Sequence, residues 1–450
     1  MGLNIQTGEL SNMVNELSGV RYNVARASVT DGKVQNLAKY INEDTLRAIH
    51  RKIDGNKAKG IDGISKDEYG RNLDENLSLL VQRMKRGNYF PKPSRRVYIP
   101  KDTTGKMRPL GISSYEDKLI ENAIAQILEQ VYEPKFYDES FGFRPNRSCH
   151  QAVREIVNAV QYRKTSYVVE ADIKGFFDNV NHEWLIKMLE HDIADRKFID
   201  LIKKFLKAGI MENGKYLDSE VGTPQGNGAS PILANVYLHY VLDNWFDVIV
   251  TRQASGYCHL IRYADDFVCC FQFKREAEDF LKALKVRFAK YGLELAMEKT
   301  KILEFGRFAD SSRKSKGLGK PETFDFLGFT FYCSTDINHK FFRCKVKTSK
   351  KKFIKKVRDM KEWIKANRCL SLKDLFKTVN AKLRGHYQYF GVTDNSYSIM
   401  AFYRETVKAL YKWLNRRSQR HCYSWYTFNY GLLKTFPLLQ PSIRVSLFAR

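Results

Sequence analysis

The chain has 450 residues, 43% of them hydrophobic and 13% aromatic, so it is long enough for two or three domains and a large core. Its formal net charge of +26 favours a polyanionic partner, because Lys and Arg displace condensed counterions from phosphate backbones, although a basic protein without such a partner remains an alternative. The sequence argues against membrane and secreted proteins, since no apolar run approaches the length of a membrane span and the polar N-terminus does not resemble a signal or transit peptide.

Cysteine usage points to a reducing compartment. The eight cysteines include no C-x-x-C pair, which argues against a zinc knuckle or a zinc-bound nuclease module. Because no secretory signal is present, we expect the cysteines to be free thiols.

The N-terminal part of the chain is predicted to be a polar lead-in followed by helices. We expect residues 1–33 to form a flexible lead-in. Apolar residues then recur at helical spacing from Val34 to His50, and residues 77–84 suggest another helix. The Gly-rich, basic stretch at residues 56–65 lies between them and is typical of a loop.

The middle of the chain mixes predicted strands and helices. Residues 97–100 and 108–112 are predicted strands around a Thr-Thr-Gly turn. An amphipathic helix follows, with one apolar face between Leu119 and Val131. Residues 167–171 (YVVEA) are a predicted strand that delivers Asp172.

The rest of the chain moves from strands to helices. Residues 259–273 are predicted to be two strands with an acidic turn between them, followed by a helix at residues 276–291. Strands are expected at residues 302–305 and 324–333, and helices from Lys350 onward. Strands mixed with helices, followed by an all-helical tail, indicate an α+β fold and then a helical domain.

Basic charge is concentrated towards the C-terminus. Residues 340–450 hold 26 basic and 5 acidic residues, whereas the first 339 residues hold 50 basic and 45 acidic ones. Lys351, Lys352, Lys355 and Lys356 fall on one side of the predicted helix. We therefore expect nucleic acid to bind in this region, apart from the core, where we expect acidic residues to bind metal.

Two acidic segments carry the clearest chemical signals. Tyr263-Ala264-Asp265-Asp266 is flanked by apolar residues on both sides, and burying such charges costs roughly several kcal/mol per ion unless a cation compensates them. The second segment begins at Asp172, which follows the predicted strand and precedes a Gly and two aromatic residues. Taken separately, the first could be a solvated Asp-Asp turn and the second a helix N-cap.

Together the two segments predict a metal site for nucleotidyl transfer. Mg²⁺ prefers oxygen ligands, and in-line transfer uses two such ions about 3.5–4 Å apart. Asp172 from one strand could bridge both ions with Asp265 and Asp266 from a neighbouring hairpin. One ion would lower the pKa of a primer 3′-hydroxyl and the other would hold the triphosphate. Mn²⁺ is expected as a substitute for Mg²⁺.

Seven sequence blocks occur in the order found in a known family. In this order they resemble a group II intron-type reverse transcriptase, the maturase family of bacterial retroelements, and the likeness runs from about Val34 to the C-terminus. The blocks are Ile99-Pro100-Lys101 with Lys106-Met107-Arg108-Pro109-Leu110, Ser140 to Pro145, Asp172 to Asp178, Gly222-Thr223-Pro224-Gln225-Gly226 with Ser230-Pro231, Tyr263 to Asp266, Leu293 to Lys301, and Phe326-Leu327-Gly328-Phe329.

The resemblance implies a right-hand polymerase. Its fingers and palm, with an antiparallel sheet, would be followed by an α-helical thumb and maturase domain. The corresponding boundaries are residues 34–165 for an N-terminal extension and fingers, 166–340 for the palm with the catalytic site and primer grip, and 341–450 for the thumb and RNA-binding domain.

The resemblance also implies roles for individual residues. Asp172, Asp265 and Asp266 would form the catalytic, metal-binding triad. The remaining nucleotide-binding residues would be Lys101 and Arg108 on the triphosphate, Phe177 under the sugar as a barrier to a ribose 2′-hydroxyl, Gln225 in the pocket, and Lys299 as a proton donor to pyrophosphate. Surface lysines at 101 and 299 and a plain core residue at 177 are the alternatives.

RNA contacts are expected at two places. Arg144 and Arg147 would touch the template backbone, unless their turn is purely structural. In the C-terminal region, Lys351, Lys352, Arg416 and Arg417 would bind RNA, with a solvated basic helix as the alternative.

The function implied is an RNA-directed DNA polymerase that binds group II intron RNA, assists its splicing and reverse-transcribes it during mobility. Its partners would be intron and template RNA, a DNA primer or target and dNTPs in the cytoplasm of a bacterium. A homodimer is compatible with the family, although no sequence feature requires one. The family's nuclease is not expected, because the chain stops at Arg450. The alternatives are a domesticated relative serving DNA repair or phage defence, and a splicing-only maturase.

Overall fold

The computed structural model describes residues 18–30, 32–100, 107–212, 215–217, 222, 226–417 and 422–448. Its N-terminal helices pack around the buried helix α6 (Tyr115–Tyr132). The other elements of this group are α2 (Ser18–Val29), the 3₁₀ helix η1 (Ala38–Tyr40), α3 (Glu43–Lys52), α4 (Lys66–Gly70) and α5 (Leu73–Lys85).

Two expectations for the N-terminal region need correction. The lead-in is not loose throughout, because residues 18–29 form α2 and bury Val20 and Val24; residues 1–17 lie outside the described part of the chain. The helix expected from Val34 begins only at Glu43. Val34 instead forms a bridge with Ile193, so the chain enters the helix through an extended segment.

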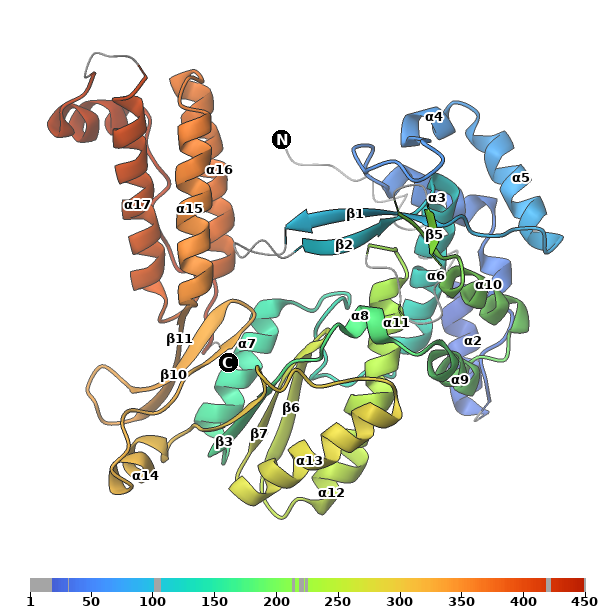
Figure 1. Cartoon of the computed structure of the whole chain (residues 1–450), viewed down its shortest axis with the longest axis horizontal. Coiled ribbons are helices and arrows are strands. Elements are labelled where there is room, and N and C mark those ends of the chain that lie inside the picture. The colour runs from blue at the N-terminus through green and yellow to red at the C-terminus, as the bar shows by residue number, and fades with distance from the viewer. Residues whose placement is uncertain are drawn as a thin grey trace.

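The fingers contain a four-stranded sheet of order β2-β1-β4-β5. The predicted hairpin is present as β1 (Ser94–Pro100) and β2 (Met107–Ile112), while its Thr-Thr-Gly turn lies outside the described residues. The short strands β4 (Ile210–Glu212) and β5 (Lys215–Leu217) complete the sheet. Helices α9 (His182–Asp192) and α10 (Arg196–Leu206) lie beside it (Figure 1).

The palm sheet has the order β6-β7-β3-β8 and is buried on both faces. Phe267 and Phe271 of β7 belong to the core on the side of helix α13, whereas Val268 and Cys270 belong to the core on the side of helix α7. Two covered faces explain the uninterrupted apolar run after Asp266. The elements are α7 (Cys149–Tyr162), β3 (Tyr167–Ala171), β6 (Cys258–Tyr263), β7 (Asp266–Phe271), α13 (Lys274–Lys290) and β8 (Lys301–Glu304).

A continuous helical stretch crosses the palm behind the sheet. It comprises α11 (Ser230–Leu238), the π-helical segments η2 (His239–Asp243) and η3 (Phe246–Val250), and α12 (Thr251–Gln253). Such π segments are rare and are often found beside functional sites. Here η2 carries Asp243, whose role is described below.

A three-stranded sheet links the palm to the thumb. Its strands are β9 (Phe324–Phe326), β10 (Phe329–Thr335) and β11 (Phe342–Thr348), preceded by the short helix α14 (Ala309–Ser315). The single strand expected at residues 324–333 is broken by Leu327 and Gly328, whose φ angles of 49° and 80° make a tight hairpin turn. The expected boundary at residue 341 is also displaced, because β11 pairs with β10 along its whole length.

The thumb follows as three long helices, with a short C-terminal cover (Figure 1). They are α15 (Lys350–Ala366), α16 (Leu372–Phe390) and α17 (Ser396–Leu414), followed by the π helix η4 (Thr427–Leu432) and α18 (Leu433–Thr435). The predicted α+β fold with a helical C-terminal domain is therefore confirmed. None of the described helices is long and apolar enough to cross a membrane. All eight cysteines lie in described segments, and no disulfide joins any two of them.

Candidate active site

Three carboxylates meet at one end of the palm sheet. In the antiparallel pairing of β3 with β7, Ala171 lies opposite Phe267, so the next residue along, Asp172, comes beside Asp266. The β6–β7 hairpin closes between Tyr263 and Asp266, which places Asp265 in its turn. We call residues 263–266 the acidic turn.

The backbone of the acidic turn takes an uncommon conformation. Ala264 has a φ angle of 57°, in the left-handed region that residues with a β-carbon rarely adopt. A two-residue hairpin loop requires such a conformation, because its twist must match that of the strands. The turn therefore sets two adjacent carboxylates at the tip of strands that are otherwise buried.

The carboxylates at this site repel one another. Burial, together with the negative charges of Asp265 and Asp172, raises the pKa of Asp266 from 3.8 to about 6. Lys299 donates a hydrogen bond to the Asp172 carboxylate, and this contact raises the pKa of Lys299. The site thus holds more negative charge than its nearest ammonium group neutralises.

The donor set fits a divalent cation by its chemistry. Carboxylate oxygens are the ligands that hard cations prefer, and a cation would relieve the repulsion that raises the pKa of Asp266. Among the described residues, however, no group of three or more His, Cys, Asp or Glu side chains is already arranged to hold a metal ion. Lys299 engages the Oδ2 atom of Asp172, so this one oxygen can serve as a metal ligand only after the ammonium group turns away.

A buried arginine anchors the acidic turn from behind. Arg262 is 0% exposed and makes two hydrogen bonds to Asp243, from Nε at 2.7 Å and from Nη2 at 2.5 Å. Its remaining Nη1 donates to the carbonyl oxygen of Ala264 at 2.9 Å and to the side chain of Asn235 at 3.0 Å. One guanidinium therefore connects η2, α11 and the acidic turn.

A glycine contact supports the turn from the side. A β-carbon at Gly142 would lie 2.2 Å from the backbone nitrogen of Ala264, so only glycine fits there. The carbonyl oxygen of Gly142 accepts a hydrogen bond from Asn235 at 2.7 Å. The block at residues 140–145 therefore supports the acidic turn, a role that its sequence did not reveal.

Gly222 and Gly226, the two ends of the block expected to line the nucleotide pocket, make close backbone contacts. A β-carbon at Gly222 would lie 2.9 Å from the carbonyl oxygens of Phe177 and Asp178, and one at Gly226 would lie 2.8 Å from that of Gly111. Both glycines have positive φ angles, of 88° and 105°. Gly222 therefore lies against the turn that carries Phe177, and Gly226 lies against strand β2 of the fingers.

A buried glutamate holds the same loop. Glu121 of α6 accepts hydrogen bonds from the backbone nitrogen of Gly228 at 3.0 Å and from the Ser113 hydroxyl at 2.6 Å. Burial raises the pKa of Glu121 to about 8. Sequence reasoning missed this residue, because a single glutamate on an amphipathic helix is usually a surface charge.

The predicted nucleotide-binding residues are only partly described. Phe177 lies in the short helix α8 (Phe176–Asn179), half-buried against Phe176, and directly follows the turn after Asp172. Arg108 is exposed on β2. Lys101 and Gln225 lie outside the described residues.

Of the two predicted template contacts, that of Arg144 needs correction. The Arg144 side chain is 2% exposed, pairs with Glu133 at 2.9 Å and donates to the Ser140 carbonyl at 2.7 Å, so it binds its own loop and has no face left for a template. Arg144 therefore stabilises the block that supports the acidic turn. Arg147 pairs with the largely exposed Asp138 and lies over the ring of Phe141, and its template contact stays a prediction.

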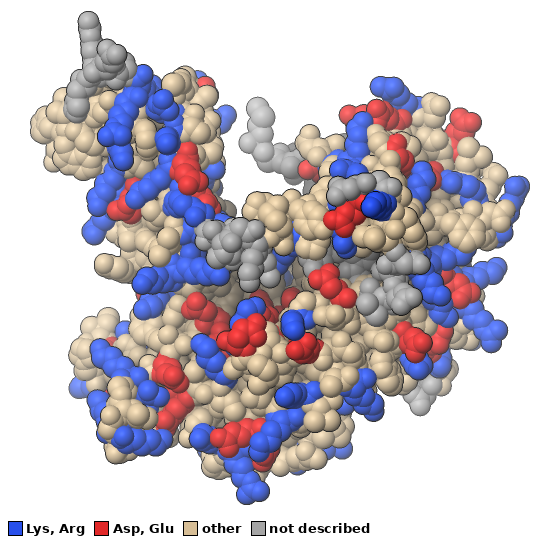
Figure 2. Space-filling view, viewed as in Figure 1, with Lys and Arg blue, Asp and Glu red and all other residues tan. Residues whose placement is uncertain are grey.

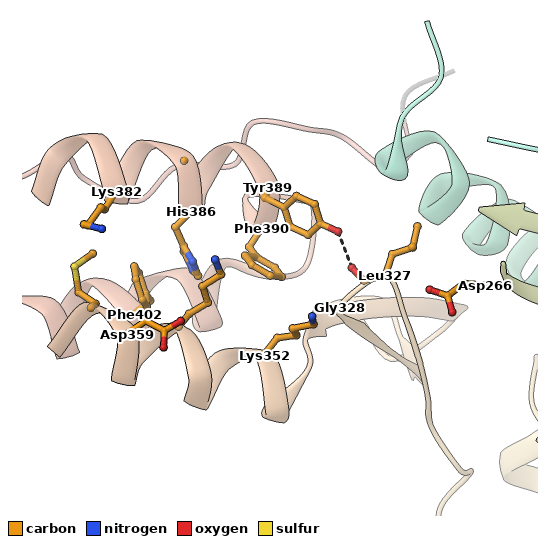
Figure 3. Close-up of a pocket in the computed structure, with 13 residues that line it drawn as sticks. Asp266, Leu327, Gly328, Lys352, Asp359, Lys382, His386, Tyr389, Phe390 and Phe402 are labelled. Atoms are coloured by element: carbon orange, nitrogen blue, oxygen red, sulfur yellow. Dashed lines mark hydrogen bonds between the residues drawn. The ribbon is translucent and has the colours of Figure 1, made fainter. Parts of the chain in front are cut away.

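A groove of about 850 Å³ leads from the acidic turn onto the thumb (Figure 3). We call it the palm–thumb groove. Asp266, Leu327 and Gly328 line it on the palm side, and the Tyr389 hydroxyl joins the thumb side to the palm side by donating to the Leu327 carbonyl at 2.9 Å. Its thumb side is lined by Lys352, Lys356, Asp359, Met360, Lys382, Gly385, His386, Tyr389, Phe390 and Phe402.

The predicted RNA-binding residues of the C-terminal region lie in two places. Lys351 and Lys352 are exposed at the start of α15, and Lys352 borders the palm–thumb groove. Arg416 is exposed after α17 and lies over the ring of Trp413, whereas Arg417 donates to the Leu370 carbonyl at 3.0 Å. Figure 2 shows basic side chains along the thumb helices beside the hollow that separates them from the fingers.

Comparison with known proteins agrees with this arrangement. A family model described as reverse transcriptase (RNA-dependent DNA polymerase) matches residues 99–331, more than half of the chain. A second model, described as group II intron, maturase-specific domain, matches residues 350–431. The resemblance identified from the sequence motifs is therefore confirmed.

Individual relatives carry related names. Group II intron-encoded protein LtrA of Lactococcus lactis subsp. cremoris is 44% identical over 199 residues, which cover 44% of this chain and 33% of LtrA. Protein YkfC of Escherichia coli (strain K12) is 31% identical over 329 residues, covering 64% of this chain and 84% of YkfC. An uncharacterized 91 kDa protein in a cob intron of Schizosaccharomyces pombe is 40% identical over 200 residues. The chain thus matches about a third of LtrA and most of YkfC.

Proposed function

The chain belongs to the reverse transcriptase (RNA-dependent DNA polymerase) family, and from this premise we propose that it is an RNA-directed DNA polymerase of the group II intron type. It copies an RNA template by adding dNTPs to the 3′ end of a primer. The observation that carries this proposal is the strand register that brings Asp172 beside Asp266 at the acidic turn.

Asp172, Asp265 and Asp266 would hold the divalent cations of the reaction, which we assign as two Mg²⁺ ions that Mn²⁺ can replace. Bound there, the cations would activate the primer 3′-hydroxyl and stabilise the charge on the triphosphate. Arg262 and Gly142 keep the acidic turn in place while the ligands change. The chain therefore supplies carboxylates on a turn that is held from behind and from the side.

Lys299 has two roles in this proposal. In the structure its ammonium group neutralises Asp172, and once turned towards the triphosphate it would give a proton to the leaving pyrophosphate. Phe177 excludes a ribose 2′-hydroxyl from beneath the nucleotide sugar. Lys101, Arg108 and Gln225 complete the nucleotide site.

The palm–thumb groove holds the primer strand as it leaves the acidic turn. Its lysines suit a phosphate backbone and its aromatic residues suit a sugar or base. The maturase-specific region, with Arg416 exposed at its end, binds group II intron RNA and thereby assists splicing. The DNA target and a bacterial cytoplasmic location belong to the same proposal.

Primer extension by an Asp265→Ala variant tests this function. We expect the variant to lose extension while it binds template–primer within a few-fold of the wild type, because the grip lies on the thumb and not on the acidic turn. Asp279→Ala, which removes an exposed carboxylate from α13, is the matched control and keeps full extension. Extension at the wild-type rate by Asp265→Ala would exclude the proposed site. Absence of extension by the wild type itself would leave a splicing-only maturase to account for the chain.

A further inference from the structure

A second groove, of about 1160 Å³, lies at the far end of the β10–β11 hairpin. We call it the hairpin groove. The end of α7, the helix α14 and the connection between β10 and β11 line it. Gly328, just before strand β10, lines the palm–thumb groove, whereas Tyr332 to Thr335 in the second half of β10 line the hairpin groove. The two grooves share no lining residue. The hairpin groove is therefore not part of the acidic site.

The hairpin groove carries an excess of positive charge. Five basic residues line it, against one acidic residue, Asp310, which pairs with Lys314 at 2.6 Å. The nearby carboxylate of Glu304 is likewise taken by Lys316 at 3.0 Å. No described acidic side chain forms an ion pair with any of the five lining residues. These are Arg307, Lys320, Lys340, Arg343 and Lys347.

Exposed aromatic rings stand among these charges. Phe341 is 70% exposed and Tyr162 is 59% exposed, and both line the groove. Lys347 lies over the ring of Tyr332, 5.1 Å from its centre, so this ring is already used as a platform for a cation. Exposed apolar rings are costly in water unless a partner covers them.

We propose that the hairpin groove binds a single-stranded segment of RNA apart from the template and primer. Basic side chains that follow a backbone, interleaved with aromatic rings on which bases stack, are the features that recognise single strands. A duplex is disfavoured, because its stacked bases present no faces to Tyr162 and Phe341. The choice of RNA among polyanions rests on the proposed function. The argument from charge and aromatic rings is independent of that function.

Binding of a labelled twelve-nucleotide oligouridylate tests the proposal. The full chain is first saturated with a short hairpin template–primer that ends in a dideoxynucleotide, so that the palm–thumb groove is occupied. We expect the double variant Tyr162→Ala/Phe341→Ala to bind oligouridylate about tenfold or more weakly, because stacking is lost at two rings. The single variant Phe341→Trp, in which Tyr162 is unchanged, keeps a ring at position 341 and should keep most of the wild-type affinity.

The charges are tested in a second pair of variants. Lys320→Ala/Lys340→Ala should lower the slope of log affinity against log salt by roughly one to two, whereas Lys285→Ala/Lys290→Ala removes equal charge from α13 and leaves the slope unchanged. Primer extension on a short template should be unchanged in all four altered proteins, which separates this site from the polymerase. If the wild type did not extend primers but the variants changed oligouridylate binding as expected, only the proposed function would be refuted. Unchanged oligouridylate affinity in the aromatic variant, or equal affinity for duplex RNA, would overturn the hairpin groove proposal.

Discussion

The buried pair Arg262 and Asp243 gives the sharpest quantitative prediction. The guanidinium is 0% exposed and the Asp243 side chain is 3% exposed, so neither charge can be hydrated if its partner is removed. Breaking such a pair costs about 3–5 kcal/mol, because one charge stays buried without compensation. We therefore expect Asp243→Ala to lower the free energy of unfolding by about 3–5 kcal/mol, measured by urea denaturation.

The double variant Arg262→Met/Asp243→Leu separates stability from positioning. Apolar residues of similar volume can replace a buried ion pair at little cost, so most of the lost stability should return. Primer extension should not return, because methionine cannot donate to the Ala264 carbonyl that the arginine holds at 2.9 Å. Glu405→Ala is the control: it breaks a partly exposed pair with Lys361 and should cost about 1 kcal/mol or less.

Two results would refute this reasoning. If Asp243→Ala cost no more than Glu405→Ala, the pair would not be the buried anchor described. If the double variant extended primers at the wild-type rate, the acidic turn would not depend on Arg262.

Three further predictions concern the nucleotide loop, the sugar and RNA. The Glu121 pKa, raised by burial from 4.5 to about 8, means that the folded protein keeps a proton that the unfolded chain loses, so the wild type should lose stability relative to Glu121→Gln as pH rises from about 4.5 to 8. The difference in unfolding free energy should reach on the order of 5 kcal/mol at most, and parallel stabilities in urea at pH 5 and pH 8 would contradict it. Phe177→Ala should relax the preference for dNTPs over rNTPs in single-nucleotide addition, and equal discrimination by the two proteins would remove Phe177 from the sugar site. Arg416→Ala should weaken RNA binding and reduce the slope of log affinity against log salt by about one, with little change in stability. Arg417→Ala should instead destabilise the thumb, because Arg417 donates a hydrogen bond to the Leu370 carbonyl. The reverse pattern in filter binding and thermal unfolding would contradict this division.

The sequence was sufficient to predict the acidic turn and its setting. Two adjacent aspartates inside an apolar run are expected at a hairpin tip. The YVVEA strand ends just before Asp172, the residue that the fold brings next to them. Local periodicity also identified the amphipathic helix α6 and the change to helices after Lys350. These features depend on neighbouring residues, which a sequence displays directly.

The supporting residues could not be predicted in this way. Arg262 stands in a buried strand where a lone arginine gives no hint of Asp243, nineteen positions earlier on a π-helical segment. Gly142 is required only because the backbone of Ala264 passes beside it. Arg144 was predicted to contact the template backbone, but Glu133 and two backbone carbonyls enclose it. Each of these roles depends on contacts between distant segments.

Anomalous diffraction from Mn²⁺ tests the central claim most directly. Crystals of the chain with template–primer and an unhydrolysable dNTP analogue should show manganese at coordination distance from Asp172 and from the acidic turn, with the Lys299 ammonium moved away from Asp172. A complex that extends primers in solution but binds no manganese at these carboxylates would contradict the account.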